Sequence, residues 1–243
     1  MANVSIATVS HVINQTRFVS TKTRERVFAA MESLNYQPNE LARSLRRGQT
    51  RTIGLILPDS ANPFFADIGR GCETTSFAAG YSTIICNTFD ASEKVQLYLE
   101  VLQKKQVDGI VFVASGDQTQ LLDQLLQQDF PVVLMVDRDM AAVPADAVLA
   151  DTFQGGYQAT RHLIDLGHKR IGCISAPENI SKRSARVEGY KQALAEAQLS
   201  FDPSIFCYGN YHPDSGYKVT QELLNSPALP EARFTHNDLL EVG

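Results

Sequence analysis

The sequence predicts an α/β protein in which two tandem doubly wound parallel-sheet lobes follow a small all-α head. Residues 1–51 contain no strand signal, whereas short apolar runs alternate with helical patterns from residue 52 onward. The head is basic, with eight Lys/Arg and three Asp/Glu, and residues 52–243 have a net charge of −10. This division favours contact between the head and a polyanion such as nucleic acid, although ordinary variation in surface charge is an alternative.

Length and composition narrow the class of protein further. A chain of 243 residues with 44% hydrophobic and 20% charged positions is typical of one to two globular domains, which excludes fibrous and disordered proteins. No apolar run is long enough for a membrane helix and no signal peptide is visible, so we expect a cytoplasmic protein that does not interact with membranes. The four cysteines lack metal-ligand spacing and are expected to be buried free thiols, with no metal or cofactor.

The head is predicted to begin with two helices. The first lies within residues 4–14 with Ser5 as its N-cap, and the second begins after Ser20 and ends before Pro38. The second helix places four apolar residues on one face: Val27, Ala30, Met31 and Leu34. A third helical segment over residues 39–47 has an apolar stripe that is too small to fold alone.

The first lobe is predicted from four near-continuous apolar runs, which are typical of strands buried on both faces of a parallel sheet. These runs cover residues 52–58, 81–87, 109–114 and 131–137. A helix with Val95, Leu99 and Leu102 on one face follows a Ser92 cap, and Gly80 marks the end of another helix. A further leucine stripe lies at Leu121, Leu122, Leu125 and Leu126. The order predicts a right-handed βαβ series.

The second lobe repeats this pattern after a looser segment at residues 141–146. Strands are expected at residues 147–150, 170–175, 205–208 and 232–235, with helices near 153–166, 184–197 and 215–225. Gly167 marks a helix end. Open α/β sheets bind ligands at the carboxyl ends of their strands, so a cleft between the lobes is the expected pocket. The predicted domains are 1–37, 38–51, 52–151 and 152–243.

Several ordered motifs carry a resemblance to a known family. The head contains V-S-I-A-T-V-S-H-V-I-N, then F-V-S-x-x-T-R-x-x-V, L-N-Y-x-P-N and L-A-R-S-L. The body contains N-P-F-F, V-D-G-I-V, L-I-D-L-G-H-K-R-I, R-V-E-G-Y and F-T-H-N-D. Together they resemble the lactose-repressor/galactose-repressor (LacI/GalR) family, most closely its ribose and purine repressors. The resemblance implies a helix-turn-helix head, a hinge helix over 38–51 and two lobes like those of periplasmic binding proteins.

The resemblance implies that the helix over residues 5–13 lies in the major groove of operator DNA. Ile6 and Ala7 then contact base edges, and Leu45 enters the minor groove beside basic residues. The expected DNA-binding residues are Ser5, Ile6, Ala7, Thr8, Ser10, His11, Asn14, Leu45 and Arg46. Three structural alternatives stay open: Ile6 packs in the head, His11 is a solvated surface histidine, and residues 39–47 form a basic linker.

The resemblance also implies a sugar site built from aromatic faces and multidentate polar groups. The expected ligand-binding residues are Phe64, Phe65, Asp90, Asp137, Arg138, Arg186, Tyr211 and Asn237. Some of these have simpler interpretations: Phe65 as core, Arg186 as a salt bridge, and Asn237 as a helix cap. The combination of N-P-F-F and Asp-Arg favours a ribose-like sugar over a purine by analogy with the family, although the aromatic rings could also stack on a purine.

The chain departs from the family pattern at both ends. Family members have a further helix before the V-S-x-x-T-V-S motif, and here the chain starts inside the turn. They also continue past N-D-L-L-E-V-G to a G-[YF]-D segment. We therefore expect weaker DNA binding and lower stability in a product with these ends.

The predicted function is a homodimeric, sequence-specific transcriptional repressor whose affinity for operator DNA is changed by a small sugar. A ligand-binding module without DNA binding, like a sugar receptor, is the alternative. An enzyme is not favoured, because no G-x-G-x-x-G follows a strand and no phosphate-binding P-loop motif occurs.

Overall fold

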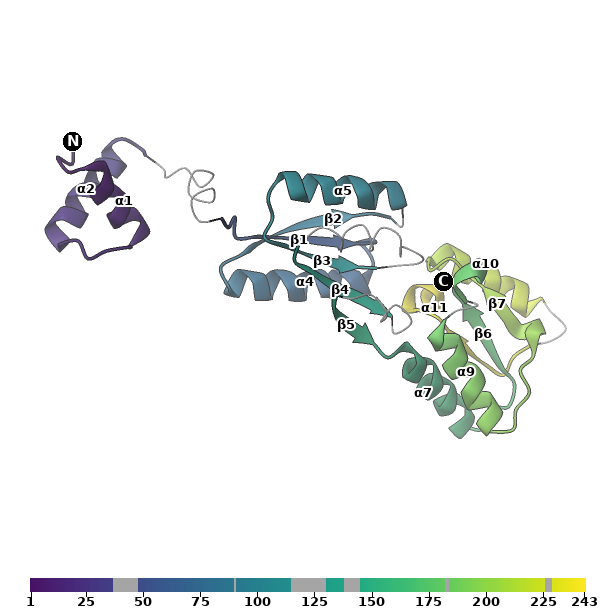
Figure 1. The fold of residues 1–243 in the computed structure, drawn as a ribbon. Helices are drawn as coiled ribbons and strands as arrows, with labels where there is room; N and C mark the ends of the chain where they lie inside the picture. Colours follow the sequence, from purple (N-terminus) through teal and green to yellow (C-terminus); the bar gives the residue numbers. More distant parts are fainter. Residues whose placement is uncertain (37–47, 90, 115–129, 138–144, 182–183, 226–228) are drawn as a thin grey trace. The chain divides into compact units, whose positions relative to one another are not determined.

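The computed structural model divides the chain into two compact units, Met1–Arg51 and Thr52–Gly243 (Figure 1). The structure describes residues 1–36, 48–89, 91–114, 130–137, 145–181, 184–225 and 229–243. The first unit contains helices, and the second contains two parallel sheets with helices packed on them. This arrangement confirms the predicted fold class. The predictions for residues 39–47 and for the leucines at 121–126 lie outside the described residues.

The head contains α1 (Ile6–Asn14) and α2 (Thr21–Ser33). The Ser5 hydroxyl accepts a hydrogen bond from the Thr8 backbone N–H at 3.1 Å, which confirms Ser5 as the N-cap of α1. Ser20 precedes α2, but its hydroxyl donates to Thr23 Oγ1 and makes no bond with the helix backbone. Buried Val12 of α1 and Val27 of α2 form the apolar core of this unit.

The first lobe is a five-stranded, fully parallel sheet in the order β2-β1-β3-β4-β5. Its strands are β1 (Thr52–Leu57), β2 (Ser82–Asn87), β3 (Gly109–Val113), β4 (Val132–Asp137) and β5 (Asp146–Ala150). The observed strands agree with the predicted apolar runs to within one residue at each end. Because parallel strands need a crossover to return to the same end of the sheet, helices must cover its faces.

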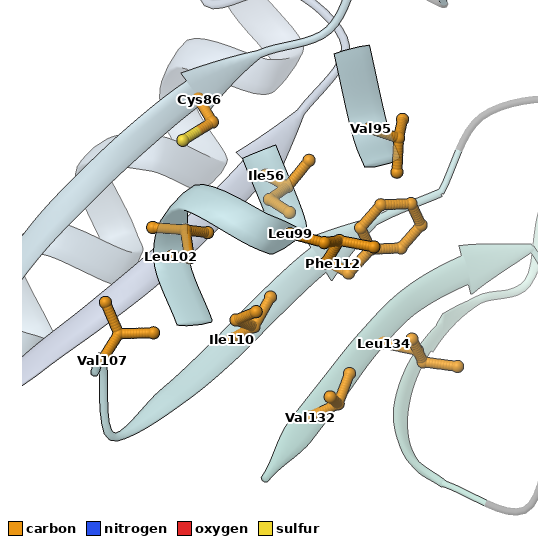
Figure 2. Close-up of a cluster of buried hydrophobic side chains, with 10 residues drawn as sticks. All are labelled: Ile56, Cys86, Val95, Leu99, Leu102, Val107, Ile110, Phe112, Val132 and Leu134. Atoms are coloured by element: carbon orange, nitrogen blue, oxygen red, sulfur yellow. The ribbon is translucent and has the colours of Figure 1, made fainter. Parts of the chain in front are cut away.

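Two helices cover opposite faces of this sheet, α4 (Pro63–Ala78) and α5 (Ser92–Lys104) (Figure 1). The α5 stripe of Val95, Leu99 and Leu102 packs on Ile56 and Phe112 in the cluster drawn in Figure 2. The neighbouring β1 residues Leu55 and Leu57 point to the other face, where they meet α4. The predicted cap was wrong: Ala91 is the N-cap of α5, and Ser92 is its first helical residue.

The second lobe has a three-stranded parallel sheet in the order β7-β6-β8. The strands of this sheet are β6 (Ile171–Ser175), β7 (Phe206–Tyr208) and β8 (Ala232–Thr235). The helices of the lobe are α7 (Thr152–Asp165), α8 (Glu178–Ser181), α9 (Ala185–Glu196), α10 (Pro213–Leu224) and α11 (Asp238–Val242), and a 3-10 turn, η2 (Pro203–Ile205), precedes β7. Cys173 and Phe234 pack with Tyr190 of α9 on one face, and Ile174 packs with Val219 of α10 on the other. The carboxyl ends of β6 and β8 therefore lie between two helical layers.

Two glycines end helices in the left-handed region, as predicted: Gly80 at φ +79° and Gly167 at φ +97°. The cysteines are free thiols, but the prediction that all are buried was wrong, because Cys72 and Cys207 are half-buried. Within the described ranges, no helix is both long and apolar enough to cross a membrane.

Candidate nucleic-acid interface and ligand site

The head contains a cavity of about 530 Å³ where the beginnings of α1 and α2 meet the turn between them. It is lined by Val4, Ser5, Thr8, His11, Arg17, Phe18, Val19 and Thr23. Hydroxyl, imidazole and guanidinium groups are the side chains that contact phosphate oxygens. The first turn of a helix also presents backbone N–H groups and the positive end of its dipole. The cavity therefore presents groups that can contact the phosphate oxygens of a nucleic acid.

Ile6 and Ala7 are exposed in the first turn of α1, next to this cavity. The Ile6 side chain is 90% exposed, which contradicts the alternative that it packs in the head. Ser5 and Thr8 share a hydrogen bond of 2.9 Å between their hydroxyl oxygens, and this contact fixes the start of the helix. An isolated, fully exposed isoleucine on a helix that begins at a basic cavity is suited to apolar contact with a base edge.

The remaining predicted residues of α1 are half-buried and hold the end of the helix. His11 Nδ1 shares a 2.7 Å hydrogen bond with Thr16 Oγ1, so His11 is not simply a solvated histidine. The Asn14 amide donates to the Ser10 carbonyl at 2.9 Å and to the Ser10 hydroxyl at 3.2 Å. Ser10 and Asn14 thus have a structural role in this conformation. Leu45 and Arg46 lie outside the described residues.

The sequence interpretation missed five residues that line the head cavity: Val4, Arg17, Phe18, Val19 and Thr23. Arg17 supplies a positive charge in the turn after α1, and the Phe18 side chain is 93% exposed. An arginine beside an aromatic residue directly after the proposed reading helix is a signal that the sequence offered. These two residues line the cavity because the turn after α1 brings them back to the beginning of that helix.

In the first lobe, the N-P-F-F motif forms the beginning of α4, after the carboxyl end of β1. Asn62 Oδ1 accepts a hydrogen bond from the Phe64 N–H at 3.0 Å, and Pro63 occupies the first helical position. The rings of Phe64 and Phe65 meet edge to face with 5.2 Å between centroids. Phe64 is 59% exposed, whereas Phe65 packs on the core. Phe64 is therefore the ring available to a ligand.

The polar groups predicted beside these rings are described only in part. Asp137 is the last residue of β4, at the carboxyl edge of the sheet. Asp90 and Arg138 lie outside the described residues. Because β4 is two strands from β1 in this parallel sheet, the carboxyl ends of both strands lie on the same edge.

In the second lobe, Arg186 begins α9, and Asn237 follows the carboxyl end of β8. Asn237 Oδ1 accepts from the Leu240 N–H at 3.0 Å, so Asn237 is the N-cap of α11, as its simpler interpretation held. Its amide donates to the Tyr211 carbonyl at 3.2 Å. Tyr211 has φ +70°, a left-handed conformation that is costly for an aromatic residue.

The structure adds a residue that the sequence interpretation did not select. His236 lies between β8 and α11, and its ring meets the Tyr211 ring at a centroid distance of 5.5 Å. The side chain is only 7% exposed. Burial, with the nearby positive charge of Arg186, lowers the pKa of His236 to about 3, so the imidazole is neutral at pH 7. The residue follows β8 and precedes Asn237 in the sequence, and the fold brings the ring of Tyr211 against it.

No group of three His, Cys, Asp or Glu residues forms a metal site in the part of the chain that the structure describes.

Family models match almost the whole chain. Residues 1–39 match the family described as bacterial regulatory proteins, lacI family. Residues 50–243 match the family described as periplasmic binding proteins and sugar binding domain of LacI family.

Among the similar proteins is the HTH-type transcriptional repressor PurR of Haemophilus influenzae (strain PittEE), with 42% identity. That alignment covers 100% of this chain and 72% of the relative. The ribose operon repressor of Escherichia coli (strain K12) is 39% identical, with 100% of this chain and 74% of the relative covered. The chain thus spans about three quarters of the length of these relatives.

Two solved structures extend the comparison. The lac repressor dimer bound to operator and the anti-inducer ONPF matches with a TM-score of 0.85 and 27% identity, over 98% of this chain and 72% of that one. A LacI family transcriptional regulator from Enterococcus faecium with bound ribose matches with a TM-score of 0.66 and 35% identity, over 79% of this chain and 68% of that one.

Proposed function

The chain belongs to the LacI family of bacterial regulatory proteins, and on this basis we propose that it is a homodimeric transcriptional repressor whose affinity for operator DNA is set by a small ribose-like sugar. The single observation that carries the DNA-binding half is the exposed Ile6 at the start of α1, beside the basic head cavity. We assign residues 1–37 to the DNA-binding head, 38–51 to the hinge, and 52–151 and 152–243 to the two ligand-binding lobes.

The head binds DNA with α1 in the major groove. There the Ile6 side chain contacts thymine methyl groups, the apolar feature that distinguishes an A·T pair. Ser5, Thr8 and Arg17 at the cavity contact the adjacent phosphates and fix the orientation of the helix. The net charge of +5 on residues 1–51 supplies the attraction, while the acidic body is repelled by the phosphate backbone.

The body binds the sugar at the carboxyl edges of its two sheets. The exposed ring of Phe64 offers an aromatic face to the C–H groups of a sugar ring, and Asp137 and Arg186 offer polar groups to its hydroxyls. The ribose named for one relative, and bound in one solved family member, supports this class of ligand. Such a protein acts in the cytoplasm, where the operator is, and it catalyses no reaction.

DNA binding is tested by selecting duplexes from a random library with the purified protein and measuring their affinity at rising salt concentrations. We expect a pseudo-palindromic site, because two copies related by a twofold axis read two half-sites. The affinity should fall by about a thousandfold or more between 50 and 200 mM salt. Ile6→Ala should change the preferred base at one position of each half-site and leave the salt slope unaltered, since it removes no charge.

Ligand control is tested by adding D-ribose, other monosaccharides and purines to the selected complex. A shift in operator affinity with one sugar supports the proposal. A response to purines alone would show that the effector is a purine and not a sugar. Sugar binding in calorimetry without any selected duplex would instead favour a ligand-binding module. Failure of both assays would overturn the proposed function.

A further inference from the structure

His236 lies near three predicted ligand residues of the second lobe: Arg186, Tyr211 and Asn237. Its ring contacts the Tyr211 ring, and the charge of Arg186 acts on it. The next residue, Asn237, holds the Tyr211 backbone. The His236 N–H donates to the Ile174 carbonyl at 2.8 Å, so the residue extends from the sheet at the carboxyl ends of β6 and β8. This is the edge at which parallel α/β sheets bind ligands.

The Nδ1 atom of His236 is buried and has no hydrogen-bond partner among the described residues. The great majority of buried polar atoms in folded proteins are paired, because an unpaired one costs free energy. The adjacent Tyr211 also has an unfavourable backbone conformation. A polar ligand atom that reached Nδ1 would supply the missing hydrogen bond.

The chemistry of the imidazole narrows the class of ligand. In a neutral ring, each nitrogen is a donor in one tautomer and an acceptor in the other. A hydroxyl group can both donate and accept, so it satisfies Nδ1 in either tautomer, whereas a carboxylate can only accept. The positive charge of Arg186 opposes protonation of the ring, so His236 offers no charge to an anion.

We propose that His236 is a further ligand-binding residue, whose Nδ1 exchanges a hydrogen bond with one hydroxyl group of a neutral polyol in the effector site. This inference rests on the proposed function and deepens it, because it assigns a specificity-determining contact to the second lobe. The contact selects ligands by the presence of a hydroxyl at one ring position. A site built to bond a hydroxyl rejects an analogue that lacks it, since its own polar atom is then left unpaired.

Two variants of the full chain separate this role from a structural one. His236→Asn places an amide near the position of Nδ1, and His236→Leu retains apolar bulk without a polar atom. The same changes at His162, which is exposed on α7, serve as matched controls. Calorimetry measures the binding of D-ribose and of pentoses that each lack one hydroxyl, and circular dichroism checks the fold and the melting temperature of every variant.

We expect His236→Leu to weaken D-ribose binding about tenfold or more, and His236→Asn to retain it within about threefold. The deoxy-pentose that lacks the contacted hydroxyl should bind weakly to the natural protein. The His236→Leu substitution should not weaken its binding further. The His162 variants should bind D-ribose normally. If His236 has only a structural role, His236→Leu will bind ribose as the natural protein does while its melting temperature changes.

Four results would overturn the inference. Unchanged ribose binding by a folded His236→Leu excludes the contact, and so does an equal loss for every deoxy-pentose in that variant. If His236→Leu does not fold, loss of ribose binding by a folded His236→Asn also excludes it. Absence of ribose binding by the natural protein overturns the sugar-binding proposal and this inference with it, and that outcome is recognised before any variant is made.

Discussion

The buried imidazole of His236 couples the stability of the protein to pH. Its pKa is lowered to about 3 in the folded chain, against about 6.5 for an unfolded one. Below pH 6.5 the unfolded chain therefore binds a proton that the folded chain does not, and the free energy of unfolding falls as the pH falls towards 3. From pH 7 to pH 5 this amounts to about 2 kcal/mol.

Urea denaturation at pH 7 and pH 5 measures this dependence. We expect His236→Asn to lose about 2 kcal/mol less than the natural protein over that interval, because asparagine does not titrate. Hydrogen bonds lower the pKa of the Glu196, Asp202 and Glu231 carboxyls, but these groups are the same in both proteins and cancel in the comparison. An equal pH dependence in both proteins would show that the pKa of His236 is not lowered in the folded state.

Single residues also show how far a sequence motif defines a side chain's role. Asn237 was expected in the ligand site with a helix cap as the alternative, and the structure shows the cap. Ile6 was expected to read bases with packing as the alternative, and its 90% exposure excludes packing. A motif indicates which residue type occupies a position, but exposure and hydrogen-bond partners depend on the surrounding elements.

At the scale of elements, the position of Arg186 depends on how closely α9 approaches α7. A Cβ atom at Gly189 would lie 2.1 Å from the Phe153 carbonyl oxygen, and one at Gly156 would lie 2.0 Å from the Arg186 carbonyl oxygen. These glycines allow the two helix backbones to touch. The adjacent Gly155 lies on the same helix as Gly156 and has open space around it.

Gly189→Ala should therefore destabilise the protein by about 1–3 kcal/mol, because the helices must separate to admit a methyl group. Gly155→Ala is the matched control and should leave stability unchanged or raise it by up to about 1 kcal/mol through helix propensity. Urea denaturation at pH 7 measures both variants. Equal effects of the two substitutions would contradict close packing of α7 on α9.

At the scale of the whole molecule, exposed apolar residues on neighbouring elements of the first lobe suit the proposed homodimer. Phe77 near the end of α4 is 76% exposed, and Ile85 of the adjacent strand β2 is 45% exposed. Exposed single apolar residues are common, but a group of them on a sheet edge and its covering helix is typical of an interface. Leu97 on α5, at 55% exposure, lies over the opposite face of the sheet.

We expect Phe77→Asp to raise the dissociation constant of the dimer about tenfold or more, because it places a charge in the apolar contact. Leu97→Asp is the control and should leave the dimer intact. Sedimentation velocity over a range of concentrations distinguishes the two. A dimer that is unaffected by Phe77→Asp, or weakened equally by both variants, would place the interface elsewhere.

Local patterns along the chain were enough to predict the order of the elements and the fold class. Strands buried on both faces must be apolar throughout, so β1, β3 and β6 are visible as continuous runs, and Gly80 and Gly167 end helices because they adopt φ above zero. Local patterns also located α1 through the Ser5 cap, since a cap and its helix are neighbours in the chain.

Which residues surround each site depends on how distant segments of the chain pack together. Arg17 and Phe18 line the head cavity because a turn returns them to the beginning of α1, and His236 meets Tyr211 because two loops end beside the same sheet. Such contacts join residues that are distant in sequence, and no periodic pattern encodes them. Burial and an unpaired nitrogen, which give His236 its proposed role, are properties of that packing.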